Sequence, residues 1–230
     1  MENHIIIGYK EGKFLNPHES KGKSFCSNYE GVNYCGVQYS PILFSHLNCQ
    51  GNEESIVIEA DENLLELIKT EVKDNELRIY AEKNIGYAAS KKIMVTFKEV
   101  SKITSTSGSD VISTNTITAD YLELKSSSGS DMKLSVNTTT LDCNSSSGSD
   151  IKISGNTEKL VADASSGSDI KASKLMAVSS QVKATSGADI TVNTAKELTA
   201  DANSGGDIKY YGNPDIVNKT DSHSGSISKQ

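Results

Sequence analysis

The chain has 230 residues, a formal net charge of −7 and 36% hydrophobic residues, with no tryptophan. This length allows one large all-β domain or two small ones, and the low apolar content suits the narrow core of a repeat protein better than a compact globular core. The acidic balance, with Arg78 as the single arginine, argues against nucleic-acid binding and against binding to an anionic membrane surface.

The N-terminal part of the sequence differs from the rest. Residues 1–24 are polar and have no periodicity, so we expect this segment to be loose. The apolar run at residues 5–7 is too short for the core of a signal peptide, so the protein either is cytoplasmic or begins after a removed leader. No run reaches the roughly 20 apolar residues of a membrane helix, and we expect no membrane span.

Residues 25–100 predict a β-rich cap or a set of first, irregular coils. Residues 55–60 alternate as a strand does. Residues 61–68 begin with an acidic cap and predict a short helical turn or a bend. Residues 69–72 and 76–80 predict a hairpin, and residues 93–97 predict a strand that leads into the next part of the chain.

The four cysteines form no metal-binding pattern. Cys26, Cys35, Cys49 and Cys143 include no C-x-x-C pair, and we expect no zinc site. The first three could hold one disulfide, but reduced and mostly buried thiols are the preferred interpretation.

The dominant feature is an internal repeat from residue 101 to the C-terminus, with Ser-Gly-Ser-Asp as its signature. Its glycines follow one another at steps of 21, 19, 19, 20, 18 and 20 residues. They are Gly108, Gly129, Gly148, Gly167, Gly187, Gly205 and, in degraded form, Gly225.

The residues around each glycine alternate between apolar and polar. Around Gly129, for example, Leu122 and Leu124 precede the glycine and Met132 and Leu134 follow it. Period two predicts strands on both sides of the turn, and stacked coils about 4.8 Å apart would bury the apolar columns. We therefore predict an all-β fold: a single-stranded β-solenoid with about 20 residues per coil, over residues 101–230. A flexible Gly/Ser linker is rejected, because linkers do not place Leu or Ile at fixed offsets.

The last repeat predicts a C-terminal cap. Counting from Gly225, Asn218, Thr220 and Ser222 replace the apolar residues and Ile227 replaces the aspartate.

The aspartate column is the sharpest chemical feature of the repeat. We expect its carboxylates to stand about 4.8 Å apart, where repulsion needs an offset from hydrogen bonds in the turn or from a neighbouring lysine column. Calcium is the alternative offset, although the known calcium repeat has two glycines and a nine-residue period. The calcium candidates are Asp110, Asp131, Asp150, Asp169, Asp189 and Asp207.

No catalytic residues are predicted. The serines just before each glycine, such as Ser128 and Ser147, are expected to form hydrogen-bonded ladders, and no histidine lies in a regular coil to activate them. The coils also carry no arginine and no insertion longer than about two residues, so we expect no place for an enzyme's cleft.

The sequence resembles a known family at two places. Residues 55–64, continuing through 70–72 to 75–79, resemble the opening of the bacterial "putative auto-transporter adhesin, head GIN domain" family, a domain of unknown function. The repeated Ser-Gly-Ser-Asp followed by Ile or Val resembles that family's Ser-Gly-Ser-Gly-Asp-Ile repeats. The resemblance covers roughly residues 29–227. It implies a right-handed β-solenoid from the envelope or exterior of Bacteroidetes-type bacteria, without catalytic residues. The turn here is one glycine shorter, except at Gly205-Gly206.

These features predict a non-enzymatic, adhesin-like binding module of the cell envelope or surface, with no cofactor. Its partner would be a glycan or a surface protein, and exposed ends of the solenoid could form a homodimer. The alternatives are a purely structural or sensory envelope domain and a β-helix carbohydrate-active enzyme. The tyrosines near the two ends either cap the core or stack on a ligand. They are Tyr29, Tyr34, Tyr39, Tyr210 and Tyr211.

Overall fold

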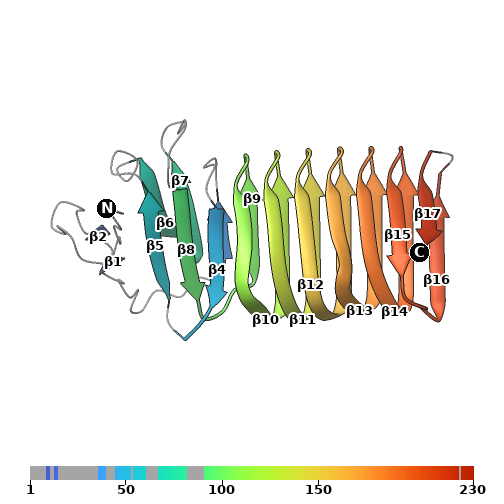
Figure 1. The fold of residues 1–230 in the computed structure, drawn as a ribbon, viewed down its shortest axis with the longest axis horizontal. Coiled ribbons are helices and arrows are strands. Elements are labelled where there is room, and N and C mark those ends of the chain that lie inside the picture. Colours follow the sequence, from blue (N-terminus) through green and yellow to red (C-terminus); the bar gives the residue numbers. More distant parts are fainter. Residues whose placement is uncertain are drawn as a thin grey trace.

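The computed structural model is a long stack of β-coils, and it describes residues 9–10, 13–14, 36–39, 45–52, 54–60, 67–81, 91–222 and 224–230. Within these residues every regular element is a strand (Figure 1). None of them is a helix suited to crossing a membrane. The predicted helical turn or bend at residues 61–68 lies almost wholly outside the described residues, as do Cys26 and Cys35.

The stack contains five long strands. Each of them bends near its middle and makes up most of one coil. They pair in parallel with their neighbours, aspartate against aspartate at the start of each strand. The strands are β10 (Asp110–Ser127), β11 (Asp131–Ser146), β12 (Asp150–Ser165), β13 (Asp169–Thr185) and β14 (Asp189–Asn203). The predicted fold, a single-stranded solenoid with about 20 residues per coil, is confirmed.

Shorter strands flank this stack. The strand β9 (Lys102–Thr106) precedes it, and β15 (Asp207–Tyr211), β16 (Ile216–Asp221) and β17 (Ser226–Lys229) complete its C-terminal end. Figure 1 shows narrow turns along the upper edge of the stack and broader bends along the lower edge.

The narrow turns are two-residue turns with left-handed backbone at both central positions. Ser128 and Gly129 have φ values of 57° and 71°, and the other Ser-Gly pairs repeat this geometry. Two consecutive positive φ values define a type I′ turn, whose twist matches the strands that it joins. The repeat keeps Ser-Gly here because glycine adopts this conformation without strain.

The core is a thin layer between the strand halves on either side of each turn. Leu122 and Leu124 from one half and Val111 and Ile117 from the other are fully buried. The same columns are buried in the following coils, so each coil completes the apolar surface of its neighbour, as expected for a solenoid.

A ladder of buried hydroxyl groups lies beneath the Ser-Gly turns. Ser130 Oγ lies 2.8 Å from Ser126 Oγ and 2.9 Å from the carbonyl oxygens of Ser105 and Ser127, and it accepts a hydrogen bond from the Ser127 N–H. Ser149 repeats this arrangement one coil further. The buried hydroxyls satisfy backbone groups that the turn leaves unpaired.

The hydrogen-bonded ladder expected on the serines before glycine is formed by their backbone and not by their hydroxyl groups. Ser128 and Ser147 have exposed side chains, because the type I′ conformation directs them outward. These serines contact the neighbouring coil through their backbone carbonyl groups. The Ser147 carbonyl, for example, accepts a hydrogen bond from the Gly129 N–H at 3.1 Å.

The N-terminal strands stack out of sequence order. The strands β3 (Gly36–Tyr39) and β4 (Ser45–Gln50) pair in parallel with β9 and β10 on one side. On their other side they pair in parallel with β7 (Glu76–Ala81) and β8 (Lys91–Phe97). The coil formed by β3 and β4 therefore separates β8 from β9, two strands that follow each other directly in the chain.

The predicted strands of this part are confirmed. The hairpin of β6 (Ile68–Lys73) and β7 turns at Asp74 and Asn75, which both have positive φ. The strand β5 (Ser55–Ala60) pairs antiparallel with β8. A separate pair, β1 (Tyr9–Lys10) and β2 (Lys13–Phe14), is antiparallel.

Gln50 joins the inserted coil to the solenoid. Its side-chain amide donates to the carbonyls of Lys98 and Thr118, both at 3.0 Å, and its side-chain oxygen accepts from the Thr118 N–H at 2.6 Å. Its backbone exchanges two hydrogen bonds with the side chain of Asn115. These bonds replace strand pairing where β4 ends and the chain between β8 and β9 passes over it.

The C-terminal register corrects our alignment of the last repeat. Gly225 donates its N–H to Ser222 as Gly206 does to Asn203, so it lies one position later than the other repeat glycines. Ser226 therefore faces Asp207, and Ile227 faces Ile208.

The same shift moves the preceding columns. Lys219 and Asp221, and not Thr220 and Ser222, pair with Ala200 and Ala202. The Lys219 ammonium lies 4.7 Å from the ring centroid of Tyr210. Charged residues in core columns of the last coil protect an exposed sheet edge.

Candidate ligand groove along the bend edge

The bends opposite the Ser-Gly turns are the variable edge of the solenoid. The register shifts between neighbouring long strands fall here, for example between Ile112 and Thr116 and between Ala172 and Met176. A type I′ turn accepts only two residues, so differences in coil length are absorbed in the bends. In repeat proteins the edge that carries such variation is often the binding face.

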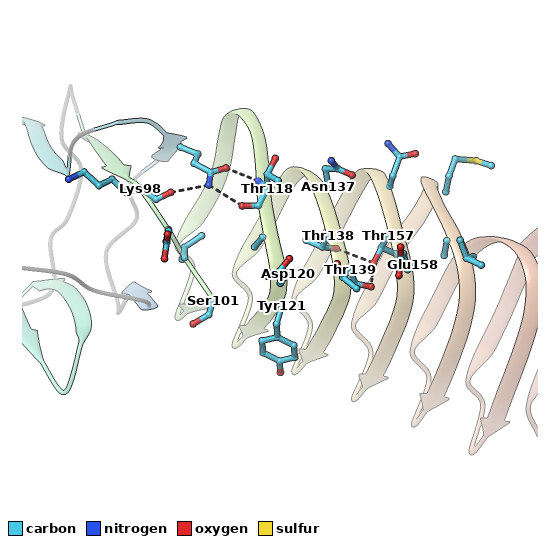
Figure 2. Close-up of a pocket in the computed structure, with 18 of the residues that line it drawn as sticks. Lys98, Ser101, Thr118, Asp120, Tyr121, Asn137, Thr138, Thr139, Thr157 and Glu158 are labelled. Carbon is cyan, nitrogen blue, oxygen red and sulfur yellow. Dashed lines mark hydrogen bonds between the residues drawn. The ribbon is translucent and has the colours of Figure 1, made fainter.

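A groove of about 1050 Å³ runs along this edge across successive coils (Figure 2). The segment between β8 and β9, with Lys98 and Ser101, lines one end of it, and Ala195 lines the other. Between them the lining comes from the bends of β10, β11, β12 and β13.

The sequence-based expectation that a cleft has no place to form is corrected by this groove. No long insertion builds it. It arises because the bends are irregular and because the segment at residues 98–101 crosses over the inserted coil, which no repeat pattern reveals.

One outward-facing column of residues follows the whole edge, and we call it the bend row. Its members pair in register from coil to coil. They are Thr118, Asn137, Asn156, Met176, Asn193 and Tyr211. All are exposed or half-buried, and Figure 2 shows Asn137 on the outer side of its bend.

The next column faces inward and holds the bend together. Thr138 and Thr157 are buried and joined by a hydrogen bond of 3.0 Å. Thr194 is buried in the same column and bonds to Ser180 at 2.7 Å. These bonds fix the backbone from which the bend row projects.

Exposed apolar side chains gather on the same edge. Tyr121, Met176 and Val178 line the groove and are 46%, 50% and 40% exposed. Among the described residues, the other large hydrophobic side chains with comparable exposure lie at the C-terminal end of the stack: Tyr211, Ile216 and Val217. The two broad faces of the described solenoid carry none, so the bend edge combines amides with apolar surface.

The groove is weakly acidic. Among its described lining residues, Glu99, Asp120 and Glu158 are carboxylates and Lys98 is the one cation. Partial burial, and then the charges of Asp142 and Glu123, raise the pKa of the Tyr121 hydroxyl. Tyr121 is therefore a neutral hydrogen-bond donor at physiological pH.

The predicted tyrosines lie in different environments. Tyr211 belongs to the bend row, whereas Tyr210 is 6% exposed and lies in the core beneath Lys219. Tyr39 lies in β3, and Tyr29 and Tyr34 are outside the described residues. Tyr210 is thus a core residue whose ring is not exposed for stacking on a ligand.

Sequence reasoning missed the amides of the bend row. Asn137 and Asn156 both lie eight residues after their glycines, but Asn193 lies six residues after Gly187, because the bends differ in length, so an alignment on glycine separates Asn193 from the other two. A signal was present in the dipeptide Asn-Thr, which recurs at Asn137, Asn156 and Asn193.

The predicted aspartate column forms an unbroken ladder from Asp110 to Asp207 on one broad face. Lys171 bridges two of its members, with its ammonium 2.9 Å from Asp150 and 2.8 Å from Asp169. The hydrogen bonds to Asp169 and then Asp150 raise the pKa of Lys171. Within the described residues no group of three or more His, Cys, Asp or Glu side chains is placed to hold a metal ion.

The ladder is less well compensated where the lysine column is interrupted. Ile112 stands in the position that Lys133 occupies in the next coil. Partial burial, and then the charge of Asp131, raise the pKa of Asp110. An acid whose pKa is raised by folding loses stability as pH rises through that value, because the folded state binds the proton more tightly.

We therefore expect Asp110→Asn to raise the melting temperature at pH 7 and to have little effect at pH 3, where the carboxyl is protonated. Asp150→Asn is the matched control from the same column. It removes an exposed ion pair with Lys171 and should lower the melting temperature at pH 7 by about 1–2 °C. Thermal unfolding of both variants at the two pH values tests this, and a shift of the same sign for both at pH 7 would contradict it.

The parallel ladders, the one-strand coils and the lateral groove define a β-solenoid repeat protein. The model of the family described as "putative auto-transporter adhesin, head GIN domain" matches residues 44–214. The chain belongs to this family, as its sequence resemblance implied.

Solved structures share the fold. A "putative adhesin" from Bacteroides fragilis superposes with a TM-score of 0.81 at 22% identity, covering 91% of this chain and 98% of that one. A "putative adhesin" from Parabacteroides distasonis has a TM-score of 0.71 at 18% identity, with 91% and 98% coverage. A "putative lipid binding protein" from the same species has a TM-score of 0.68 at 19% identity, with 91% and 97% coverage. The comparison with curated proteins finds no match.

Proposed function

We propose that this protein is a non-enzymatic, adhesin-like module of the cell envelope or surface, which binds an extended ligand along the groove of the bend edge. The observation that carries the proposal is the coincidence of three features on one edge: the groove, the bend row and the exposed side chains of Tyr121, Met176 and Val178. Exposed apolar groups gathered on one surface mark interaction sites. The family's adhesin label supports the same role.

The shape of the groove favours a long ligand. It is open and spans several coils, whereas sites for small molecules are concave pockets that enclose most of the ligand. One similar structure is described as a lipid-binding protein, but an acyl chain would leave the groove's carboxylates and amides without hydrogen-bonding partners. A polar polymer provides hydrogen-bonding partners for these carboxylates and amides.

The test is binding of the purified protein to an array of glycans, host matrix proteins and lipids. We expect saturable binding to a polar polymer that weakens at least about tenfold in the double variant Tyr121→Ala/Met176→Ala, which removes two apolar contacts. Gln181→Ala is the control, because Gln181 is exposed on a strand half away from the groove.

A blank array would contradict the binding role and favour a purely structural or sensory domain. Binding that the groove variant leaves unchanged would refute the position of the site. Shortened glycan products would favour the carbohydrate-active enzyme. The array is also read in calcium and in EDTA, because loss of binding in EDTA would point to the aspartate ladder as a calcium site.

A further inference from the structure

We propose that the ligand is an uncharged polysaccharide strand that lies along the solenoid axis on the bend row. This inference rests on the proposed binding function and names its ligand class.

The spacing of the bend row is that of the stacked strands. Its members pair directly from coil to coil, so they repeat about every 4.8 Å. One pyranose ring of an extended polysaccharide is close to this length, so successive sugars can meet successive rungs. An extended peptide repeats its side chains and backbone groups about every 6.7 Å and loses register with neighbouring rungs.

The amides of the row match sugar hydroxyls. Each Asn side chain offers two N–H donors and one carbonyl acceptor, so it can bind two neighbouring hydroxyl groups that each donate and accept. The structure records no side-chain hydrogen bond for Asn137 or Asn156, and the Asn193 side chain makes a single recorded hydrogen bond, from its amide nitrogen to the sulfur of Met176 at 3.2 Å. These amides are therefore available to a ligand.

Apolar groups lie at intervals within and beside the same row. Met176 interrupts the amides, Tyr211 ends the row with 40% exposure, and Tyr121 flanks it on the groove. The C–H face of a sugar ring packs against such surfaces, and the tyrosine hydroxyls can bond to the ring's substituents. A row of amides with apolar groups among and beside them thus suits a molecule with polar edges and apolar faces.

The charges along the row select against acidic polymers. Asp120 and Glu158 line the groove beside the row, and Lys98 lies only at its N-terminal end. Carboxylates near a bound uronate or sulfated sugar would repel it across a short distance. A neutral polysaccharide meets no such penalty.

The experiment is affinity electrophoresis of the full chain in gels that contain mannan, xyloglucan or dextran as neutral probes and polygalacturonate as an acidic probe. A fluorescent peptide of alternating Ser and Lys, measured by anisotropy, is the peptide probe. We expect retardation by at least one neutral polysaccharide and about tenfold weaker binding in Asn137→Ala/Asn156→Ala, because each lost amide contributes one or two hydrogen bonds. Gln181→Ala should bind within twofold of the unchanged protein.

Each outcome decides a different point. Binding to the peptide or to polygalacturonate alone, lost in the Asn double variant, would overturn the ligand class and leave the binding role intact. Retardation by a neutral polysaccharide that the double variant preserves would overturn the assignment to the bend row. No binding to any of the probes would overturn the ligand class, and a blank array beside it would remove the proposed function as well.

Discussion

Replacing Gly155 with alanine is expected to destabilise the folded protein by about 3–5 kcal/mol, because two penalties add at this position. Gly155 has a φ of 114°, which side chains other than hydrogen rarely allow. An added Cβ would also meet the Val136 carbonyl oxygen in the neighbouring coil at a distance far inside van der Waals contact. The backbone of two coils would have to separate at the bend.

Gly148→Ala is the matched control for this prediction. Gly148 has a φ of 68°, but an added Cβ would find no atom within 4 Å, so only the left-handed conformation is penalised, by about 1–2 kcal/mol. Urea unfolding of the two variants measures the difference. Amide hydrogen exchange should show the loss of protection in β11 and β12 for Gly155→Ala, and equal destabilisation of both variants would contradict the prediction.

Ser149→Ala is expected to destabilise the protein by about 1–3 kcal/mol, because it leaves buried backbone groups unsatisfied. The Ser149 hydroxyl accepts from the Ser146 N–H at 3.1 Å and lies 2.9 Å from the Ser126 carbonyl and 2.8 Å from the Ser146 carbonyl. Alanine offers none of these contacts and leaves no room for a replacing water in a fully buried position.

Two further variants test the cause. Ser147→Ala, two residues away and exposed, should change the free energy of unfolding by less than about 0.5 kcal/mol. The double variant Ser145→Ala/Ser149→Ala should lose less than the sum of its single variants, because the two hydroxyls bond to each other at 2.9 Å. A later coil has alanine at both positions: Ala184 corresponds to Ser145, and Ala188 corresponds to Ser149. Strict additivity would argue against a shared hydroxyl network.

The coils themselves could be predicted from the sequence. The Ser-Gly-Ser-Asp repeat and the alternation on either side of it predicted the strands, the period and the aspartate ladder, because backbone geometry makes each of these a local property. The hairpin at Asp74 and Asn75 and the strand β5 followed from equally local signals.

The candidate site could be predicted only in part. Tyr211 was named among the tyrosines that either cap the core or stack on a ligand, but the amides of the bend row were missed. Asn193 follows its glycine at a shorter distance than Asn137 and Asn156 follow theirs, so the three do not form one column in the sequence. The register of the last coil was missed by one residue for a similar reason. Glycine marks a turn in the sequence, yet Gly225 occupies the position after the turn, and only the pairing partners distinguish the two.

By itself the sequence determined the repeating unit: two strands, a Ser-Gly turn and an apolar column on each side, all set by interactions within about twenty residues. Tertiary structure alone decided which coil stacks on which, as the insertion of β3 and β4 between β8 and β9 shows. The physical reason is that parallel strands pair through backbone N–H and C=O groups, which are the same in every coil. Backbone pairing therefore does not require that neighbouring coils follow each other in the sequence. Side chains such as Gln50 select the neighbour, and the groove forms where these long-range contacts meet the irregular bends.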